Sequence, residues 1–344
     1  MKRLKGFQKG INLGGWLSQY MSCEKTHFDT YITEKDIKLI ADGGFDHIRL
    51  PIDYDIIEDE NGADREEGYA HIDDCIDWCK KYGLNMILDL HKTCGYTFVN
   101  AMTPEGDSFF ENAELQERFY CIWRKLSARY GKNKKCMIFE LLNEVVNPDY
   151  AQAWNYIAAK TIEAIRAEAP DIGIMVGGVL YNSVVGIPLL APPADENIIY
   201  TFHCFEPLCF THQKAAWVEN VDFDMPYPAD ISLYRERSRL LKPFQAGVIF
   251  NTNITKVGTE FFRCMFREAV KIAEKYNVAL YCGEYGVIEH APTKDTLCWL
   301  SDINTVFNEY GIGRALWSYK DMSFGILNDH YHDIINKMID IVTS

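Results

Sequence analysis

Long uninterrupted runs of apolar residues are missing from this sequence of 344 residues. Because a helix needs about 20 apolar residues to cross a bilayer, we expect no membrane-spanning helix. No apolar run follows the basic N-terminal MKRLKGFQKG, so we expect no secretory signal peptide, while a mature form that has lost its leader stays an alternative. Basic stretches are short and the formal net charge is −14, which argues against nucleic acid or an anionic membrane as partner.

A paired cysteine framework is also missing. The eleven cysteines are scattered and none forms a CxxC pair; Cys75 and Cys79, on one predicted helix, lie four residues apart. We interpret the cysteines as reduced thiols, and together with the missing signal peptide they predict a cytoplasmic protein. The sequence contains no clear metal-ligand cluster, so we expect neither a metal nor a cofactor.

Short apolar stretches rich in β-branched and aromatic residues are present and alternate with amphipathic ones. They predict eight strands, at 7–13, 47–52, 85–91, 136–142, 172–178, 198–205, 279–285 and 313–319. Helices are predicted between and after them, at 33–43, 70–82, 112–130, 150–168, 260–276, 294–310 and 331–342. Thr33 with Asp36 resembles a capping box, and Asn112 precedes a Glu-rich first turn.

Eight such units predict an α/β fold, a (β/α)8 TIM barrel, as one domain over residues 1–344. A doubly wound sheet is the alternative, but it usually has a GxGxxG turn after the first strand, where this chain has GINLGGW. The stretch 206–258 is too long for an ordinary connection. We interpret it as an inserted subdomain, a lid over the active face; a solvent-exposed loop with incidental aromatic residues is the alternative.

Polar and indole-bearing residues stand at the predicted carboxyl ends of seven of the eight strands. In a barrel these ends meet at one mouth, where the active site lies. A single such residue would mean little, but their convergence predicts a site. The residues are Asn12 and Trp16, Arg49, His91, Asn143 and Glu144, His203, Glu284, and Trp317.

Two glutamates at one mouth are typical of glycoside hydrolysis, in which one carboxyl protonates the leaving oxygen and the other is ionised. Arg49 would keep one of them ionised, and Trp317 would offer a flat face to a sugar. No Ser or Cys lies in a recognisable nucleophile elbow. Alternatives stay open: Glu144 and Glu284 as ion pairs of the barrel, and Arg49 as the partner of a core acid such as Asp89.

The stretch FELLNEVV (139–146) contains a second glutamate, Glu140, on the same face of the strand as Glu144. If the strand covers 136–142, Glu140 lies within the barrel wall and Glu144 reaches the mouth. Glu140 is then a buried structural carboxylate whose partner the sequence does not name.

Seven motifs together resemble family 5 glycoside hydrolases, and bacterial single-domain endoglucanases with a subdomain after the sixth strand in particular. In chain order they are GINLGGW (10–16), HIRLP (47–51), LDLH (88–91), ELLNEV (140–145), FHCF (202–205), CGEYG (282–286) and ALWSYK (315–320). The resemblance implies a retaining mechanism with Glu144 as general acid/base after Asn143 and Glu284 as nucleophile. It also implies substrate-binding or supporting roles for Arg49, His91, His203 and Trp317.

Two positions depart from the family pattern. Phe205 stands where the family usually has a tyrosine that hydrogen-bonds the nucleophile, and Lys92 stands where a second histidine often follows the first. Loss of the hydroxyl is expected to raise the pKa of Glu284 or to leave its carboxylate less well oriented. Tyr285 and Tyr200 are candidates to replace it.

We therefore predict a monomeric endo-acting hydrolase of β-1,4-glucans. A β-mannanase or a β-1,3- or mixed-linkage glucanase is the alternative on the same scaffold, and a non-catalytic carbohydrate-binding protein is the alternative of another class. An unrelated barrel lyase or isomerase is disfavoured by the lack of a phosphate or metal site. Further sugar contacts are predicted at Trp16, Tyr20, Tyr96, Asn182, His212 and Trp217.

Overall fold

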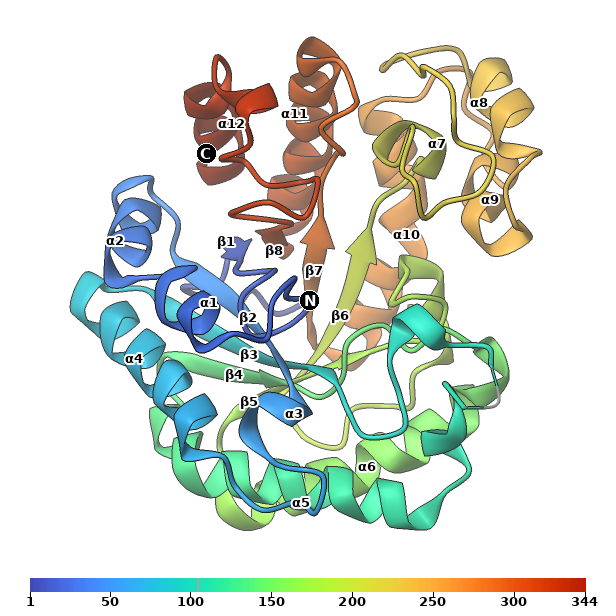
Figure 1. Cartoon of the computed structure of the whole chain (residues 1–344). Helices are drawn as coiled ribbons and strands as arrows, with labels where there is room; N and C mark the ends of the chain where they lie inside the picture. The colour runs from blue at the N-terminus through green and yellow to red at the C-terminus, as the bar shows by residue number, and fades with distance from the viewer. Residues whose placement is uncertain (104) are drawn as a thin grey trace.

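The computed structural model describes residues 1–103 and 105–344, and the side chains of all of these except 243–245. Eight parallel strands form a closed barrel in chain order, which confirms the predicted (β/α)8 fold (Figure 1). The strands are β1 (Lys9–Asn12), β2 (His47–Asp53), β3 (Asn85–Lys92), β4 (Met137–Glu140), β5 (Gly173–Gly177), β6 (Ile198–Cys204), β7 (Ala279–Tyr285) and β8 (Gly313–Leu316).

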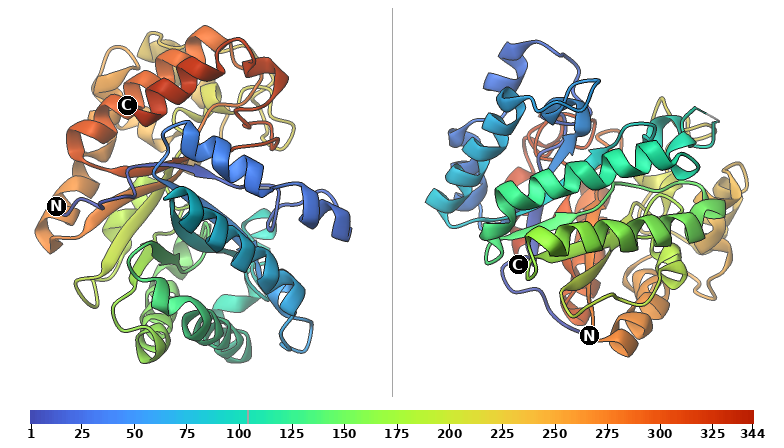
Figure 2. Two further views of the ribbon diagram at one scale, coloured as in Figure 1. Left: turned by 90° about the vertical axis from the view of Figure 1, so that its left-hand side faces the viewer. Right: turned by 90° about the horizontal axis from the view of Figure 1, so that it is seen from below.

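Long helices lie outside the barrel, close to the predicted ranges. They are α2 (Glu34–Asp42), α4 (Glu66–Tyr82), α5 (Ala113–Tyr130), α6 (Ala151–Glu168), α10 (Thr259–Tyr276), α11 (Thr293–Tyr310) and α12 (Ile335–Thr343). Figure 2 shows α5 and α6 running side by side, and they pack against each other. Five short helices were not predicted: α1 (Lys25–Thr30), α3 (Tyr54–Ile57), α7 (Leu208–Thr211), α8 (Ile231–Ser238) and α9 (Pro243–Phe250).

The crossover between β5 and β6 differs from the other six. Its longest helical element is the six-residue 3-10 helix η5 (Val184–Leu189), which contains Pro188. Helix α10, which follows β6, packs against η5 and covers this part of the wall.

Two predicted helix starts are confirmed by side-chain caps. The backbone N–H of Thr33 donates to Asp36 Oδ2 at 2.9 Å, completing a capping box at the start of α2. The Asn112 side chain accepts the N–H groups of Glu114 and Leu115 at the start of α5. These bonds satisfy amides that have no partner within the helix.

Strands β4 and β8 end earlier than the sequence predicts. Strand β4 stops at Glu140 instead of 142, and β8 stops at Leu316 instead of 319. The hydrophobic pattern continues past both ends because Leu141, Leu142 and Trp317 remain buried, although the paired residues of these strands end at Glu140 and Leu316. Hydrophobic periodicity reflects burial. A strand predicted from it is therefore too long wherever the loop that follows is also buried.

The barrel interior is apolar toward the amino ends of its strands. Phe7 with residues of six strands forms a small separate cluster there: Ile87, Ile138, Met175, Ile199, Ala279, Tyr281 and Ala315. The larger core lies between the sheet and the helices. Packing therefore closes the bottom of the barrel and leaves its other end for polar side chains.

The segment 206–258 forms the short helices α7, α8 and α9 beside α10 and α11, drawn in yellow at the upper right of Figure 1. Its base is attached to α11, because the Tyr227 hydroxyl donates to Asp302 at 2.8 Å and the Tyr227 N–H to Asp295 at 3.0 Å. That it acts as a lid stays a prediction. Along the described chain, none of the helices has the length and apolar character needed to traverse a bilayer.

Helix α4 approaches α3 so closely that only glycine fits at the contact. A Cβ added to Gly68 would lie 1.9 Å from the backbone oxygen of Ile56. We expect Gly68→Ala to lower the free energy of unfolding by about 1–3 kcal/mol, because backbone must shift to admit the methyl group. Thermal or urea unfolding measures this, with Gly247→Ala in α9 as control, since a Cβ there meets nothing within 4 Å. Equal stability of the two variants would contradict the close approach.

Candidate active site

Arg49, on the buried strand β2, is the centre of the mouth. Its guanidinium contacts three carboxylates: Asp89 at 3.0 Å, Glu140 at 2.7 Å and Glu284 at 2.9 Å. The contact with Glu140 is bidentate, through Nε and Nη2. Arg49 thus supplies the partner of Glu140 that the sequence did not name, and it contacts Asp89 and Glu284 as well. Because its side chain is fully buried, these contacts are screened little by water.

Glu284 stands just beyond a bulge in β7. Cys282 pairs with Phe202 and Glu284 pairs with His203, so Gly283 is an extra residue. Such bulges redirect the following side chain. The Asn12 side chain stabilises this arrangement: its amide donates to the Gly283 carbonyl at 2.9 Å, and its oxygen accepts Arg49 Nη1 at 3.0 Å. The sequence places Asn12 at the mouth without a role, and this bridge is one.

Glu144 follows β4 in a left-handed backbone conformation, with φ of 39°. This conformation is uncommon for a residue with a side chain and persists only where neighbours hold it. The Tyr96 hydroxyl donates to the Glu144 carbonyl at 2.6 Å and accepts the Val146 N–H at 2.9 Å. On the side chain, Oε1 of Glu144 lies 2.8 Å from His203 Nδ1.

The two glutamates lie close together and differ in their environments. Carboxylate oxygens of Glu144 and Glu284 and a ring nitrogen of His203 lie within 4.8 Å of one another. Burial raises the pKa of Glu284 to about 8, with Arg49 opposing the effect. Burial and then the Glu284 charge raise the pKa of Glu144 well above its usual range. The pair therefore keeps its last proton on Glu144, as an acid with an ionised neighbour requires.

The two histidines at the mouth are neutral. Burial, reinforced by Arg49, lowers the pKa of His91 to about 3 and that of His203 well below its usual value. His91 Nδ1 lies 2.7 Å from Asp89, and its Nε2 lies 2.8 Å from the Gln19 amide nitrogen. Nδ1 therefore carries the proton and Nε2 accepts from Gln19. The Trp317 ring lies parallel to His91, 5.9 Å away.

Glu144, His203 and Glu284 form the one group in the described part of the chain with the spacing of a metal site. His203 Nδ1 lies 2.8 Å from Glu144 Oε1, so a hydrogen bond between two members of the group accounts for their spacing without a cation.

Comparison with known proteins identifies the family. Residues 8–323 match the family model described as cellulase (glycosyl hydrolase family 5). This chain belongs to glycosyl hydrolase family 5. It is therefore a glycoside hydrolase, as the motifs predict.

Curated relatives and solved structures agree with this family 5 assignment. The chain is 41% identical to endoglucanase C of Acetivibrio thermocellus over 98% of both chains. It is 40% identical to cellodextrinase A of Ruminococcus flavefaciens over 91% of this chain and 86% of that protein. The Thermotoga maritima Cel5A structure in complex with cellobiose has a TM-score of 0.75 at 20% identity, covering 97% and 98% of the two chains, which supports the fold.

The structure brings seven predicted residues of this family 5 enzyme into one connected mouth. Each has contacts with its neighbours there: Arg49, His91, Asn143, Glu144, His203, Glu284 and Trp317. Asn143 accepts Arg49 Nη2 at 3.0 Å, while its Nδ2 is buried without a hydrogen-bond partner among the described groups.

Two predicted sugar contacts are not supported, because their side chains are fully buried. Trp16 donates from its indole to the Phe28 carbonyl at 2.8 Å and stacks on Trp78. Asn182 lies against Gly177, away from any exposed surface. The sequence did not reveal that neighbouring residues cover both side chains.

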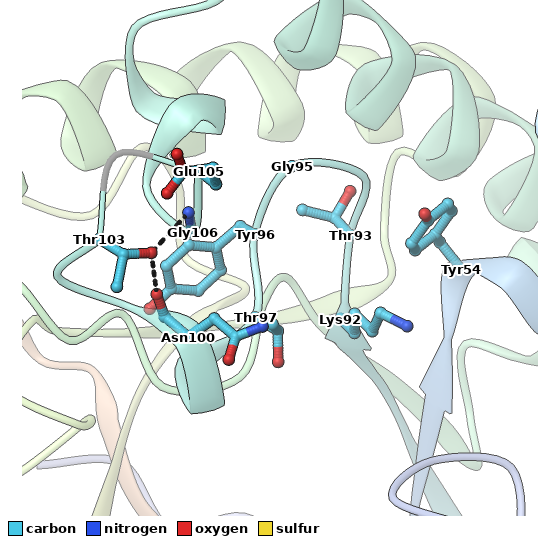
Figure 3. A pocket seen from close by; sticks show the side chains of 10 residues that line it. All are labelled: Tyr54, Lys92, Thr93, Gly95, Tyr96, Thr97, Asn100, Thr103, Glu105 and Gly106. Atoms are coloured by element: carbon cyan, nitrogen blue, oxygen red, sulfur yellow. Dashed lines mark hydrogen bonds between the residues drawn. The ribbon is translucent and has the colours of Figure 1, made fainter.

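Tyr96 differs from its prediction too, since both of its hydroxyl contacts are to the backbone at 144–146. Its ring lines a cavity of about 410 Å³ beside β3, with Tyr54, Lys92, Thr97 and Asn100 among the other lining residues (Figure 3). Lys92, the second departure from the family pattern, is paired with Asp55 at 2.9 Å.

Phe205 has no hydroxyl, and the two suggested substitutes do not replace it. Tyr285 donates to Asn304 at 3.2 Å and Tyr200 to the Ala191 carbonyl at 2.8 Å, so both suggestions are wrong. The Phe205 ring instead packs on His212 and Phe324.

Trp217 is 60% exposed and extends this aromatic group outward. Its ring lies 6.3 Å from His212 and 6.5 Å from Phe324. Its role as a sugar contact, like those of His212 and of the half-buried Tyr20, stays a prediction.

Removing the charge of Glu140 leaves Arg49 without its bidentate partner inside the barrel wall. We expect Glu140→Gln to lower the free energy of unfolding by about 3 kcal/mol, while kcat/KM falls much less than in Glu144→Gln. Chemical unfolding and hydrolysis assays measure both effects. Glu117→Gln, which removes the exposed partner of Arg124, is the control and should change little. Equal stability of the two variants would contradict a structural role.

Removing the Tyr96 hydroxyl leaves the Glu144 carbonyl and the Val146 N–H unpaired. We expect Tyr96→Phe to lower kcat/KM about tenfold, because Glu144 loses a contact that holds its backbone. Tyr200→Phe is the matched control, since it removes one hydrogen bond to a loop carbonyl. If both variants keep wild-type kcat/KM, the hydroxyl does not position Glu144.

Proposed function

We propose that this protein is a retaining, endo-acting hydrolase of β-1,4-glucans that works through two glutamates. One observation carries the proposal: carboxylate oxygens of Glu144 and Glu284 lie within 4.8 Å of each other, and only Glu284 of the two is bonded to Arg49. Retaining enzymes have carboxyl groups about 5–5.5 Å apart, whereas inverting enzymes have them about 6.5–9.5 Å apart to admit a water molecule.

The mechanism assigns a different role to each carboxyl. Glu284 reacts in its ionised form, which Arg49 favours: its carboxylate attacks the anomeric carbon and forms a glycosyl ester. The Glu144 proton passes to the departing glycosidic oxygen. Glu144, now ionised, then takes a proton from water as that water attacks the ester, and the sugar leaves with its original configuration. The bridge from Asn12 to Gly283 and Arg49 keeps the nucleophile oriented.

The substrate class is supported by the relatives and by the mouth. The similar full-length proteins are named endoglucanase C and cellodextrinase A, and both names refer to glucans. The exposed Trp217 offers a flat apolar face to a sugar ring. A monomer and a cytoplasmic location stay predictions from the sequence.

The proposal is tested with defined glycans. Cellulose oligomers, mixed-linkage glucan and mannan are incubated with the protein, and new reducing ends and the anomeric configuration of the first product are followed. We expect internal cleavage of β-1,4-glucan with retention. A preference for mannan would change the assigned substrate to β-mannan. A first product with inverted anomeric configuration would overturn the retaining mechanism.

Variants separate the two roles. Glu284→Ala should abolish turnover with every substrate but keep sugar binding. Glu144→Gln should lower kcat/KM for poor leaving groups by about 10²–10⁴, and much less for a substrate that needs no acid. Full activity of Glu284→Ala would remove the nucleophile assignment, while binding without turnover in the wild type would indicate a carbohydrate-binding protein.

A further inference from the structure

Two buried polar atoms behind Glu144 have no hydrogen-bond partner among the described residues. They are Nε2 of His203 and Oγ1 of Thr201, two positions apart on β6. Both border the same small space beside Gly283. A Cβ on that glycine would lie 3.0 Å from Nε2 and 3.2 Å from Oγ1.

The protonation of His203 leaves Nε2 in need of a donor. The imidazole is neutral, and its Nδ1 lies 2.8 Å from Glu144 Oε1. If Nδ1 carries the proton, Nε2 is an acceptor. A buried acceptor without a donor destabilises the fold, whereas a threonine hydroxyl can rotate to supply a donor.

We propose that Thr201 is a positioning residue whose hydroxyl donates to His203 Nε2 through one water beside Gly283, and so keeps the proton of His203 on Nδ1, facing Glu144. The inference rests on the proposed role of Glu144 as acid. It extends that site by one residue that the sequence did not indicate and that has no contact with either glutamate carboxyl.

The tautomer decides where the proton of Glu144 points. With Nδ1–H facing it, Oε1 can only accept, so the carboxylic proton sits on Oε2, away from the histidine. In the opposite tautomer, Nδ1 would be an acceptor and would attract the Glu144 proton toward the histidine. The Glu144 carboxylic acid would then donate its hydrogen bond to His203, and it would protonate a leaving oxygen more slowly.

Thr201→Val tests this, because it keeps the shape of the side chain and removes the hydroxyl. We expect 15N NMR of histidine-labelled enzyme to find the His203 proton on Nδ1 in the wild type and partly or wholly on Nε2 in the variant. We also expect kcat/KM for an aryl β-cellobioside with a poor leaving group to fall about tenfold, and that for a good leaving group to fall less. Thr201→Ser should restore both properties.

The control variants distinguish an effect on the His203 tautomer from a general effect of removing a buried hydroxyl. Thr161→Val removes a buried hydroxyl that bonds a helix carbonyl in α6, and it should change neither readout. A His203 proton on Nε2 in the wild type overturns the proposal even if Thr201→Val fails to fold. Equal losses in Thr201→Val and Thr201→Ser, or an unchanged tautomer in Thr201→Val, overturn it as well. Failure of the Glu144 assignment would instead appear as full activity of Glu144→Gln on poor leaving groups.

Discussion

A buried guanidinium with three carboxylates around it is the interaction on which the rest of the mouth depends. Arg49 reaches Asp89 on β3, Glu140 on β4 and Glu284 on β7, so a residue of one strand ties together three others. Breaking such a buried pair leaves a charge without compensation, which is far more costly than losing a surface ion pair. In the proposed mechanism, structural support and chemistry therefore share one side chain. Glu140 and Asp89 anchor the guanidinium, and the remaining nitrogen is presented to Glu284.

The same arrangement divides the protons of the mouth. Arg49 favours the ionised form of Glu284, whereas Glu144 faces a neutral histidine and is left to keep its proton. Which glutamate holds the proton depends on the residues that orient the two side chains as much as on the glutamates themselves. Asn12 holds the bulge that aims Glu284, and Tyr96 holds the backbone of Glu144 in an uncommon conformation. Orienting groups of this kind preorganise a site before a substrate arrives.

The sequence predicts the barrel and the polar ring well, because strand periodicity and the residues at strand ends are local signals. Strand β7 has the predicted bounds, and Glu144 lies past the end of β4, with Glu140 inside the wall. What escaped prediction depends on contacts between distant residues. Trp16 is covered by Trp78 of α4, and the partner of Glu140 comes from another strand. The 3-10 crossover after β5 also gave no signal, because a short apolar stretch with a proline has no clear period.

The unusual crossover after β5 has a consequence for the order in which the chain folds. Helix α10 covers the η5 side of the wall, yet it begins at Thr259, after the whole of 206–258 has been synthesised. A chain emerging from the ribosome therefore presents β6 as an open edge until that segment and β7 are complete. Closing the barrel joins β1 to β8 across almost the full sequence, a contact of high loop entropy. Barrel closure therefore requires β8, near the end of the chain, and the Arg49 contact with Glu284 forms only once the second half of the chain is present.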